Sequence, residues 1–286
     1  MKVHAIRTGS VKVKTAQLAA RGGDITSKLN IFRDPNWSDW LPTYAWAVEH
    51  PEGVIVVDTG QATYLLDHGR SLHPFLRWEA DFQMEPEDEV GPQLKALGIG
   101  PRDVRQVVVT HLHVDHDAGL RHFPNSKILV AGGEIDKASA FMGMVRGYLP
   151  QRWPSWFDPT RLQLADGPYG PFAASQRLTK AGDVVVVATP GHTPDHVSVI
   201  VEDGNEAIFL AGDTSYTEAL MVAGKVDGVS PDAKVTMSTL ARIRQFATDR
   251  PTIYLPGHDP DSGTRLADRR TVYPVQSNIV ELRGAA

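Results

Sequence analysis

The chain has 286 residues, of which 42% are hydrophobic, and its formal net charge is −5. This size and composition indicate one globular domain over residues 1–286, and the acids and bases are mixed without the basic stripe that a nucleic-acid partner would require. The sequence has no cysteine, which excludes disulfides, thiolate nucleophiles and cysteine metal ligands. No apolar segment is typical of a signal peptide or a membrane span, so we expect a cytoplasmic protein with no membrane partner.

Hydrophobic periodicity predicts alternating strands and helices. Residues 1–60 read as short strands between polar turns, with the clearest strands at 44–49 and 54–58. Further along we predict helices at 86–98 (ending at Gly98), near 133–141 and at 232–248, and strands at 106–110, 127–131, 183–189, 196–202, 206–211 and 252–256. In the helix at 232–248, one face is expected to carry or adjoin Val235, Leu240, Ile243 and Phe246. Strands precede a helix in both halves, which favours an α/β fold with two sheets packed face to face and helices outside, an αββα sandwich.

Two segments differ from this framework, because aromatic residues and methionine gather there between Pro and Gly. The first, 68–85, carries His73, Phe75, Leu76, Trp78, Phe82 and Met84. The second, 141–157, carries Phe141, Met142, Met144, Tyr148, Leu149, Trp153, Trp156 and Phe157. We expect inserted loops that pack onto the sandwich or a second subunit, or that form an apolar channel for part of a substrate.

The segment His111-Leu112-His113-Val114-Asp115-His116 directly follows the apolar run 107–109. It places three imidazoles and a carboxylate within six residues, and these groups hold zinc or iron in proteins. Alternation after a strand sends His111 and His113 in the same direction. A turn or helix that begins at Asp115-His116 then brings two more ligands to a second, nearby metal. The segment therefore predicts a metal centre.

Three further candidate ligands, His192, Asp213 and His258, each follow an apolar strand and a turn that contains glycine. Glycine lets the chain turn sharply where a strand ends. Four strand ends that meet at one edge would bring together five histidines and two aspartates. This set suffices for two metal ions that share one carboxylate, and Asp213 is the candidate for the shared ligand.

The remaining histidines lack this context. His196 and Asp58 stand beside strand ends of the same kind, so we expect them to support the metal ligands, since a metal-bound imidazole usually needs an outer acceptor. Surface positions, or positions that support the ligands, are expected for His4, His50, His68, His73 and His122.

The ordered motifs resemble those of the metallo-β-lactamase superfamily. The HxHxDH segment, the three strand-end ligands and Val56-Val57-Asp58-Thr59-Gly60 match its pattern over about residues 40–260. Within that superfamily, Leu41-Pro42-Thr43-Tyr44 and Gly212-Asp213-Thr214-Ser215-Tyr216 look like the quorum-quenching N-acyl-homoserine lactonases. Ala118 and Asp195 depart from that pattern, because such proteins often carry glycine there.

The resemblance implies hydrolysis of a lactone ring at a binuclear site. One ion would be held by His111, His113 and His192, the other by Asp115, His116 and His258, with Asp213 bridging them. A metal-bridging hydroxide would attack the carbonyl, Tyr216 would polarise the carbonyl oxygen, and Asp115 would also move a proton. Zinc is the expected ion, with iron, manganese and cobalt left open. The resemblance also implies a homodimer.

Other functions remain as alternatives. The same fold hosts glyoxalase II-like thioesterases, β-lactamases, phosphoesterases and other lactone or ester hydrolases. We find no clear basic C-terminal region for glutathione, no cysteine ligand and no basic surface for a phosphoester. A metal-stabilised binding module without catalysis is the alternative from another class. A Gly-x-Ser-x-Gly elbow, a P-loop and a dinucleotide-binding fingerprint are all absent from the sequence.

Overall fold

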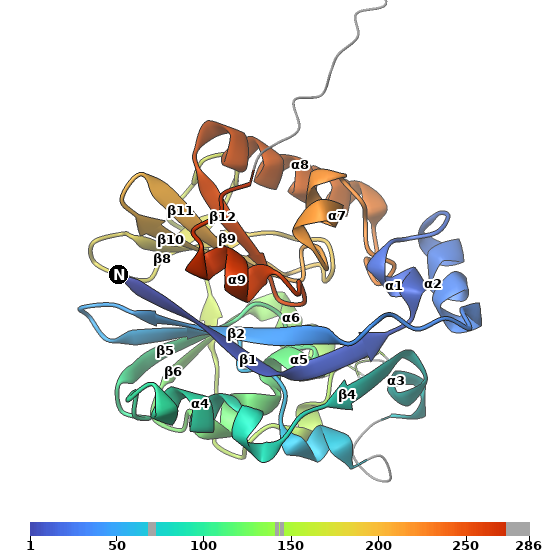
Figure 1. Ribbon diagram of the computed structural model, residues 1–286, viewed down its shortest axis with the longest axis horizontal. Coiled ribbons are helices and arrows are strands. Elements are labelled where there is room, and N and C mark those ends of the chain that lie inside the picture. Colours follow the sequence, from blue (N-terminus) through green and yellow to red (C-terminus); the bar gives the residue numbers. More distant parts are fainter. Residues whose placement is uncertain (68–72, 141–142, 144–145, 273–286) are drawn as a thin grey trace, which may run out of the picture.

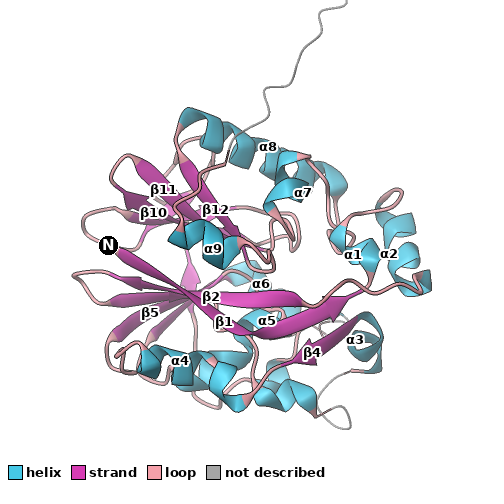
Figure 2. Ribbon diagram, in the orientation of Figure 1, coloured by secondary structure: helices cyan, strands magenta, loops and turns pink. Residues whose placement is uncertain are grey.

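Two β-sheets packed face to face form the centre of the molecule, with helices against their outer faces (Figures 1 and 2). The computed structural model describes residues 1–67, 73–140, 143 and 146–272. This arrangement confirms the predicted αββα sandwich.

The first sheet has seven strands in the order β4-β1-β2-β3-β5-β6-β7. They are β1 (Lys2–Val13), β2 (Leu41–Glu49), β3 (Val54–Val57), β4 (Ala80–Gln83), β5 (Val104–Val109), β6 (Lys127–Ala131) and β7 (Thr160–Leu162). The second sheet has five strands in the order β12-β11-β10-β9-β8. They are β8 (Ser175–Arg177), β9 (Val184–Ala188), β10 (Val197–Asp203), β11 (Glu206–Gly212) and β12 (Thr252–Pro256). The strands β3, β5, β6 and β7 pair in parallel, as do β11 and β12.

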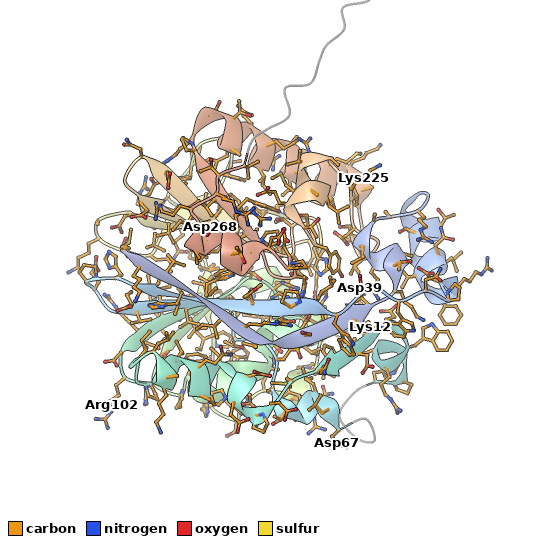
Figure 3. The ribbon with its side chains drawn as sticks, viewed as in Figure 1. Lys12, Asp39, Asp67, Arg102, Lys225 and Asp268 are labelled. Atoms are coloured by element: carbon orange, nitrogen blue, oxygen red, sulfur yellow. The ribbon has the colours of Figure 1, made fainter. Side chains whose placement is uncertain are left out.

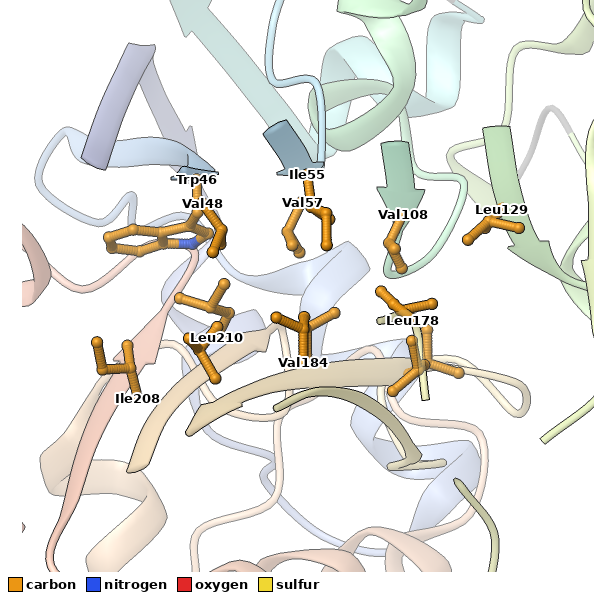
Figure 4. Packing of buried hydrophobic residues seen from close by; sticks show 14 of the residues in the cluster. Trp46, Val48, Ile55, Val57, Val108, Leu129, Leu178, Val184, Ile208 and Leu210 are labelled. Carbon is orange, nitrogen blue, oxygen red and sulfur yellow. The ribbon is translucent and has the colours of Figure 1, made fainter. Parts of the chain in front are cut away.

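The main hydrophobic core lies between the sheets (Figure 4). Trp46 and Val108 of the first sheet belong to the same buried cluster as Val184 and Leu210 of the second. Valine runs such as 184–187 suit strands that are covered on both faces, and such burial stabilises by roughly 25 cal/mol per Å² of apolar surface.

Helices cover the outer faces and the edge where the strands end. They are α1 (Thr15–Leu18), α2 (Asp24–Arg33), α3 (Pro74–Glu79), α4 (Val90–Ala96), α5 (Val114–Asp117), α6 (Gly132–Ala138), α7 (Glu218–Val222), α8 (Ala233–Asp249) and α9 (Ser262–Ala267). Single 3-10 turns lie at Thr63–Leu66, Pro86–Asp88, Ala118–His122 and Pro150–Arg152. Val90 and Leu94 of α4 pack on the first sheet, and Leu240 and Ile243 of α8 pack on the second.

The predicted elements from residue 86 onward are confirmed to within a few residues, but one detail of α8 was wrong. Leu240, Ile243 and Phe246 are buried, whereas Val235 is 39% exposed. Five residues turn a helix by about 140° beyond a full turn, so Val235 cannot share the face of Leu240. The carboxylate of Asp232 caps this helix by accepting from the backbone of Lys234 and Val235.

The prediction for residues 1–60 was incomplete. The chain begins with a strand of 12 residues, β1, rather than with short strands. Two helices that were not predicted, α1 and α2, then form a lobe beside the sandwich (Figure 1).

The expected loop at 68–85 was wrong for residues 74–83, which form α3 and the edge strand β4 paired to β1. Residues 68–72 lie outside the described part of the chain, as do Phe141, Met142 and Met144. The described part of 141–157 is irregular except for the turn Pro150–Arg152.

Among the helices described, none is long and apolar enough to cross a membrane.

Candidate metal centre

The HxHxDH segment lies where β5 ends and α5 begins. His111 is fully buried, and His113 precedes the helix as its N-cap residue. The first turn of α5 then carries Asp115 and His116. A helix immediately after a strand end therefore gives the segment two groups of potential ligands, as the sequence predicted.

The other three candidates follow strands of the second sheet. His192 follows β9, Asp213 follows β11, and His258 follows β12. Gly212, directly before Asp213, has a φ of 55°. A Cβ at Gly212 would lie 2.6 Å from His196 Nε2, so this turn needs glycine both for its conformation and for space. All seven predicted ligands meet at the edge where both sheets end.

Their donor atoms fall into three groups, in each of which the atoms lie within 4.8 Å of one another. The groups are His111, His113 and His192; His111, His116 and Asp213; and Asp115, His116 and His258. His113 Nδ1 lies 3.1 Å from His111 Nε2 and 3.0 Å from His192 Nε2. One ring nitrogen cannot form in-plane hydrogen bonds to both. Two ligands of a tetrahedral zinc ion lie about 3.3 Å apart, which is close to these distances.

Two buried atoms support this interpretation. His116 Nε2 and Asp213 Oδ1 have no hydrogen-bond partner, although they lie 3.3 Å apart. Unsatisfied buried polar atoms are rare in native structures. Their spacing fits two ligands of one ion, and His258 Nε2, at 3.2 Å from Asp213 Oδ2, extends the same pattern. The donor set therefore fits divalent metal ions.

Oxygen atoms outside the centre orient four of the imidazoles. His116 Nδ1 lies 2.9 Å from Asp58 Oδ2, and His258 Nδ1 lies 3.0 Å from the carbonyl oxygen of Pro42. His111 Nδ1 contacts Thr110 Oγ1, and His192 Nδ1 lies 3.4 Å from Asp227 Oδ1. In each ring Nδ1 faces an oxygen, which leaves Nε2 free to bind a metal.

At His111 and Asp213 the electrostatics favour the protonation states that metal binding needs, whereas neighbouring carboxylates outweigh burial and raise the pKa of His116, His192 and His258. Burial, assisted by His116, holds the pKa of His111 well below its usual range. Burial alone would raise the pKa of Asp213, but His258 and His116 outweigh this effect and hold it well below its usual range. A neutral imidazole and an ionised carboxylate are the forms that coordinate metal.

The two predicted supporting residues are confirmed in contact with the centre. Asp58 accepts from His116, and His196 Nε2 accepts from the backbone N–H of Asp213. Two others were missed by sequence reasoning. Asp227 faces His192 from the loop after α7, and Glu134 of α6 accepts from the backbone of Leu112.

The local sequence around Asp227 indicates a turn, which its carboxylate does form by accepting from Val229 and Ser230. Nothing in that pattern indicates the histidine on its other side. No sequence pattern around Glu134 indicates its role either, because the residues it contacts come from other segments of the chain.

Tyr216 lies against the metal centre. Its ring is stacked with His258 at 5.6 Å and meets His192 edge-on at 6.4 Å between centroids. Burial, with Asp213 nearby, raises the pKa of the phenol well above its usual range, so it stays protonated. No described residue accepts a hydrogen bond from its hydroxyl, and the side chain lines the cavity next to the metal centre.

That cavity has a volume of about 420 Å³ and is lined by five of the candidate ligands: His113, Asp115, His192, Asp213 and His258. Part of its wall, here called the apolar arm, is formed by Val11, Val13, Ile31, Leu76, Ala80 and Phe82. Lys137, Arg146, Tyr148 and Thr193 make another, polar part of the wall. The aromatic-rich segments thus contribute both packing residues and cavity wall, as expected.

The two departures from glycine leave the ligands in place. Ala118 has ordinary helical angles, with φ −62° and ψ −30°. Asp195 is not among the described residues with positive φ, and it forms an ion pair with Lys137. Neither position requires a conformation reserved for glycine.

Comparisons with known proteins agree with this geometry. A sequence profile of the metallo-beta-lactamase superfamily matches residues 38–258. The N-acyl homoserine lactonase AttM of Agrobacterium fabrum is 25% identical over 272 residues, which cover 92% of this chain and 94% of that protein. The N-acyl homoserine lactonase AiiA of Bacillus thuringiensis subsp. kurstaki is 27% identical over 222 residues, covering 77% of this chain and 82% of the other.

Solved structures show the same fold. An N-acyl homoserine lactone hydrolase with N-hexanoyl-L-homoserine bound at its catalytic metal centre superposes with a TM-score of 0.74 at 22% identity, covering 96% of this chain and 97% of the other. AidC, a dizinc quorum-quenching lactonase, gives a TM-score of 0.60 at 16% identity, covering 91% and 90%.

Proposed function

This chain belongs to the metallo-β-lactamase superfamily, and we propose that within it the protein opens the lactone ring of N-acyl homoserine lactones by metal-dependent hydrolysis. One observation carries this proposal. Five candidate metal ligands, the phenol of Tyr216 and the apolar arm all face the same cavity of about 420 Å³. A polar reaction centre joined to an apolar arm matches a lactone head with an acyl tail.

We further propose a binuclear centre. His111, His113 and His192 would hold one ion, and Asp115, His116 and His258 the other, with Asp213 shared between them. The three overlapping donor groups support this division. Zinc is the ion we propose, because all donors are imidazole nitrogen or carboxylate oxygen and because AidC is described as a dizinc enzyme. When bound, two divalent ions would lower the pKa of a water molecule and polarise the ester carbonyl.

The chain's own residues would orient the substrate and move protons. Tyr216 would donate a hydrogen bond to the lactone carbonyl oxygen, because its phenol is protonated, lines the cavity and has no acceptor among the described residues. Asp115 is suited to carry a proton to the leaving ring oxygen, because it too lines the cavity and its side chain is 14% exposed. Addition of water across the ester bond would yield the open-chain N-acyl homoserine and release one proton at neutral pH.

The apolar arm would bind the acyl tail. Each CH₂ group removed from water contributes up to about 0.8 kcal/mol, so longer chains have more to gain until the arm is filled. We therefore expect kcat/KM to increase from butanoyl toward longer acyl groups.

Acid release at constant pH from butanoyl, hexanoyl and dodecanoyl homoserine lactones tests the proposed function. Metal-replete protein should open these rings rapidly, and protein treated with a chelator should not. The Asp213→Ala variant serves as a matched control for contaminating hydrolases. A thioester and a simple aryl ester complete the panel. Turnover of one of these without turnover of any lactone would make the protein another hydrolase on the same fold, such as a glyoxalase II-like thioesterase.

A further inference from the structure

The carboxylate of Glu79 lies beside the apolar arm in the cavity wall. Glu79 is the last residue of α3 and lines the cavity beside Leu76 and Ala80. Its backbone oxygen accepts from the backbone of Lys14 and from Gln17 Nε2. Two hydrogen bonds, one from Lys14 and one from Gln17 of α1, therefore hold the backbone of this cavity-lining residue.

The carboxyl group of Glu79 has no hydrogen-bond donor among the residues that the structure describes, which is unusual for an acid in an apolar wall. Burial raises its pKa to about 7, although the neighbouring Lys28 acts to lower it. The ammonium group of Lys28 also lies 3.5 Å from the carbonyl oxygen of Val229, another residue of the cavity wall. Near neutral pH the carboxyl is therefore present in both forms, one that donates a hydrogen bond and one that only accepts.

Glu79 lines the same cavity as Tyr216 and His258. Burial raises the pKa of Tyr216, and Glu79 is among the carboxylates that raise it further. An acyl chain that runs from the metal centre into the apolar arm would pass Glu79, which lines the same cavity as Tyr216 and the candidate ligands.

An unsubstituted chain in this position would remove water from the carboxyl group and offer it nothing in return. A chain with an oxygen atom near the amide would replace the lost water. A carbonyl oxygen would accept from the protonated acid, and a hydroxyl would donate to the carboxylate. A site that contains an unpaired polar group discriminates strongly against ligands that leave it unpaired.

We propose that Glu79, with Lys28 beside it, is a specificity-determining residue that selects acyl lactones bearing an oxo or hydroxyl group near the amide over unsubstituted chains of equal length. This inference rests on the proposed lactonase function. Val13, Ile31 and Phe82 would still bind the aliphatic remainder of the acyl chain. The selection therefore depends on the substituent at one position of that chain and not on the overall polarity of the substrate.

The test compares three decanoyl homoserine lactones: unsubstituted, 3-oxo and 3-hydroxy. The selectivity is the kcat/KM of each oxygenated lactone divided by that of the unsubstituted one. It is measured for the wild type, Glu79→Leu and Glu79→Gln. Asp81→Asn is the matched control, because Asp81 is an exposed carboxylate two residues further on that does not line the cavity. Melting temperatures check that each variant is folded.

We expect the wild type to favour the oxygenated chains by about 10-fold, the order that the net contribution of one hydrogen bond supplies. Glu79→Leu should reduce this selectivity to about 1, chiefly by raising kcat/KM for the unsubstituted chain. Glu79→Gln should retain most of it, because an amide both donates and accepts, and Asp81→Asn should leave it unchanged. A gain of activity on one substrate cannot result from misfolding, so the readout separates selection from a merely structural role.

Two results would overturn the inference in different ways. If the wild type opens the lactones but the selectivity is the same in wild type and Glu79→Leu, the inference is wrong while the proposed function stands. If the wild type opens none of the three lactones nor butanoyl homoserine lactone, the proposed function is wrong and the inference falls with it.

Discussion

Asp58 Oδ2 lies 2.9 Å from His116 Nδ1, and the same carboxylate accepts hydrogen bonds from both the backbone and the hydroxyl of Thr110. One residue at the end of β3 thus orients a candidate ligand on α5 and also holds the end of β5. Asp58 has a φ of 60°, a conformation that few residues other than glycine adopt. The chain accepts this local strain at the position from which a carboxylate reaches both elements.

Replacing Asp58 with alanine should weaken metal binding at the position held by His116 by about 10- to 100-fold, the usual effect of losing an outer acceptor. Competition with a chromophoric chelator measures the affinity. Asp183→Ala is a suitable control, because Asp183 contacts His50 far from the centre. An affinity equal to that of the wild type would contradict the role assigned to Asp58.

The Tyr216→Phe variant should retain its metal content but lose turnover, because it removes one hydrogen bond to the developing negative charge. Loss of one such donor lowers kcat on the order of 100-fold. Steady-state lactone hydrolysis and elemental analysis provide the two readouts. Tyr64→Phe, outside the cavity lining, is the matched control. Unchanged kinetics would remove Tyr216 from the mechanism.

In the Asp213→Ala variant, at least one metal equivalent per chain should be lost, because the Asp213 carboxylate lies 3.5 Å from His192 Nε2 of one set and 3.2 Å from His258 Nε2 of the other. Elemental analysis after gel filtration gives the stoichiometry. Retention of two equivalents would show that the carboxylate is not shared.

Changing Gly212 to alanine should destabilise the fold by about 2–4 kcal/mol, because the new Cβ adds a close contact to an unfavourable φ. That Cβ would lie 2.6 Å from His196 Nε2 and 2.8 Å from Thr110 Oγ1. Gly98→Ala separates the two effects, since Gly98 has a φ of 80° but nothing within 4 Å of the added atom. Urea unfolding should show that Gly98→Ala lowers the free energy of unfolding by only about 1 kcal/mol. Equal losses in both variants would show that the contact does not matter.

Acid should weaken the α1–α2 lobe through Asp34. Burial alone would raise the pKa of Asp34, but hydrogen bonds from Thr15, Asn36 and Ala16 lower it to about 2. Because the folded pKa is below the unfolded value of about 3.9, this stabilisation is complete above pH 4 and is lost as pH falls through about 2.

The Asp34→Asn variant should therefore be less stable by about 1–2 kcal/mol at pH 6 and should show a smaller loss between pH 4 and 2. Urea unfolding of metal-free protein measures both, which removes the contribution of the metal ligands. Asp39→Asn, at an exposed carboxylate on the same side of the molecule (Figure 3), should behave like the wild type. Parallel pH profiles for wild type and Asp34→Asn would contradict this assignment.

The sequence predicted the two-sheet fold and all seven residues that meet at the metal centre, because both depend on local patterns. A valine run followed by glycine and a ligand-type side chain marks a strand end, as at His192 and Asp213. Strand ends meet at a common edge of the fold. The location of a residue at a strand end in the sequence therefore indicates that its side chain lies near the other strand-end residues.

The features that were missed depend on contacts between distant segments. The helices α1 and α2 are short, and α1 has no side-chain cap that a sequence pattern would reveal. β4 is a strand only because β1 extends far enough to pair with it. The sequence around Asp227 indicates only an ordinary turn, because its contact with His192 exists only in the folded chain. The homodimer, the cytoplasmic location, the single domain and the identity of the metal stay predictions.

Each proposed ion takes ligands from both sheets. His111 and His113 follow a strand of the first sheet and His192 one of the second, and the pairing of Asp115 and His116 with His258 repeats this division. The ions would then act as crosslinks between the halves of the sandwich, so ion binding would add directly to resistance against unfolding. Equal protease half-lives with and without a chelator would contradict this. In a cell starved of the ion, newly made chains would be degraded faster, and the amount of enzyme would follow the metal supply without any transcriptional control.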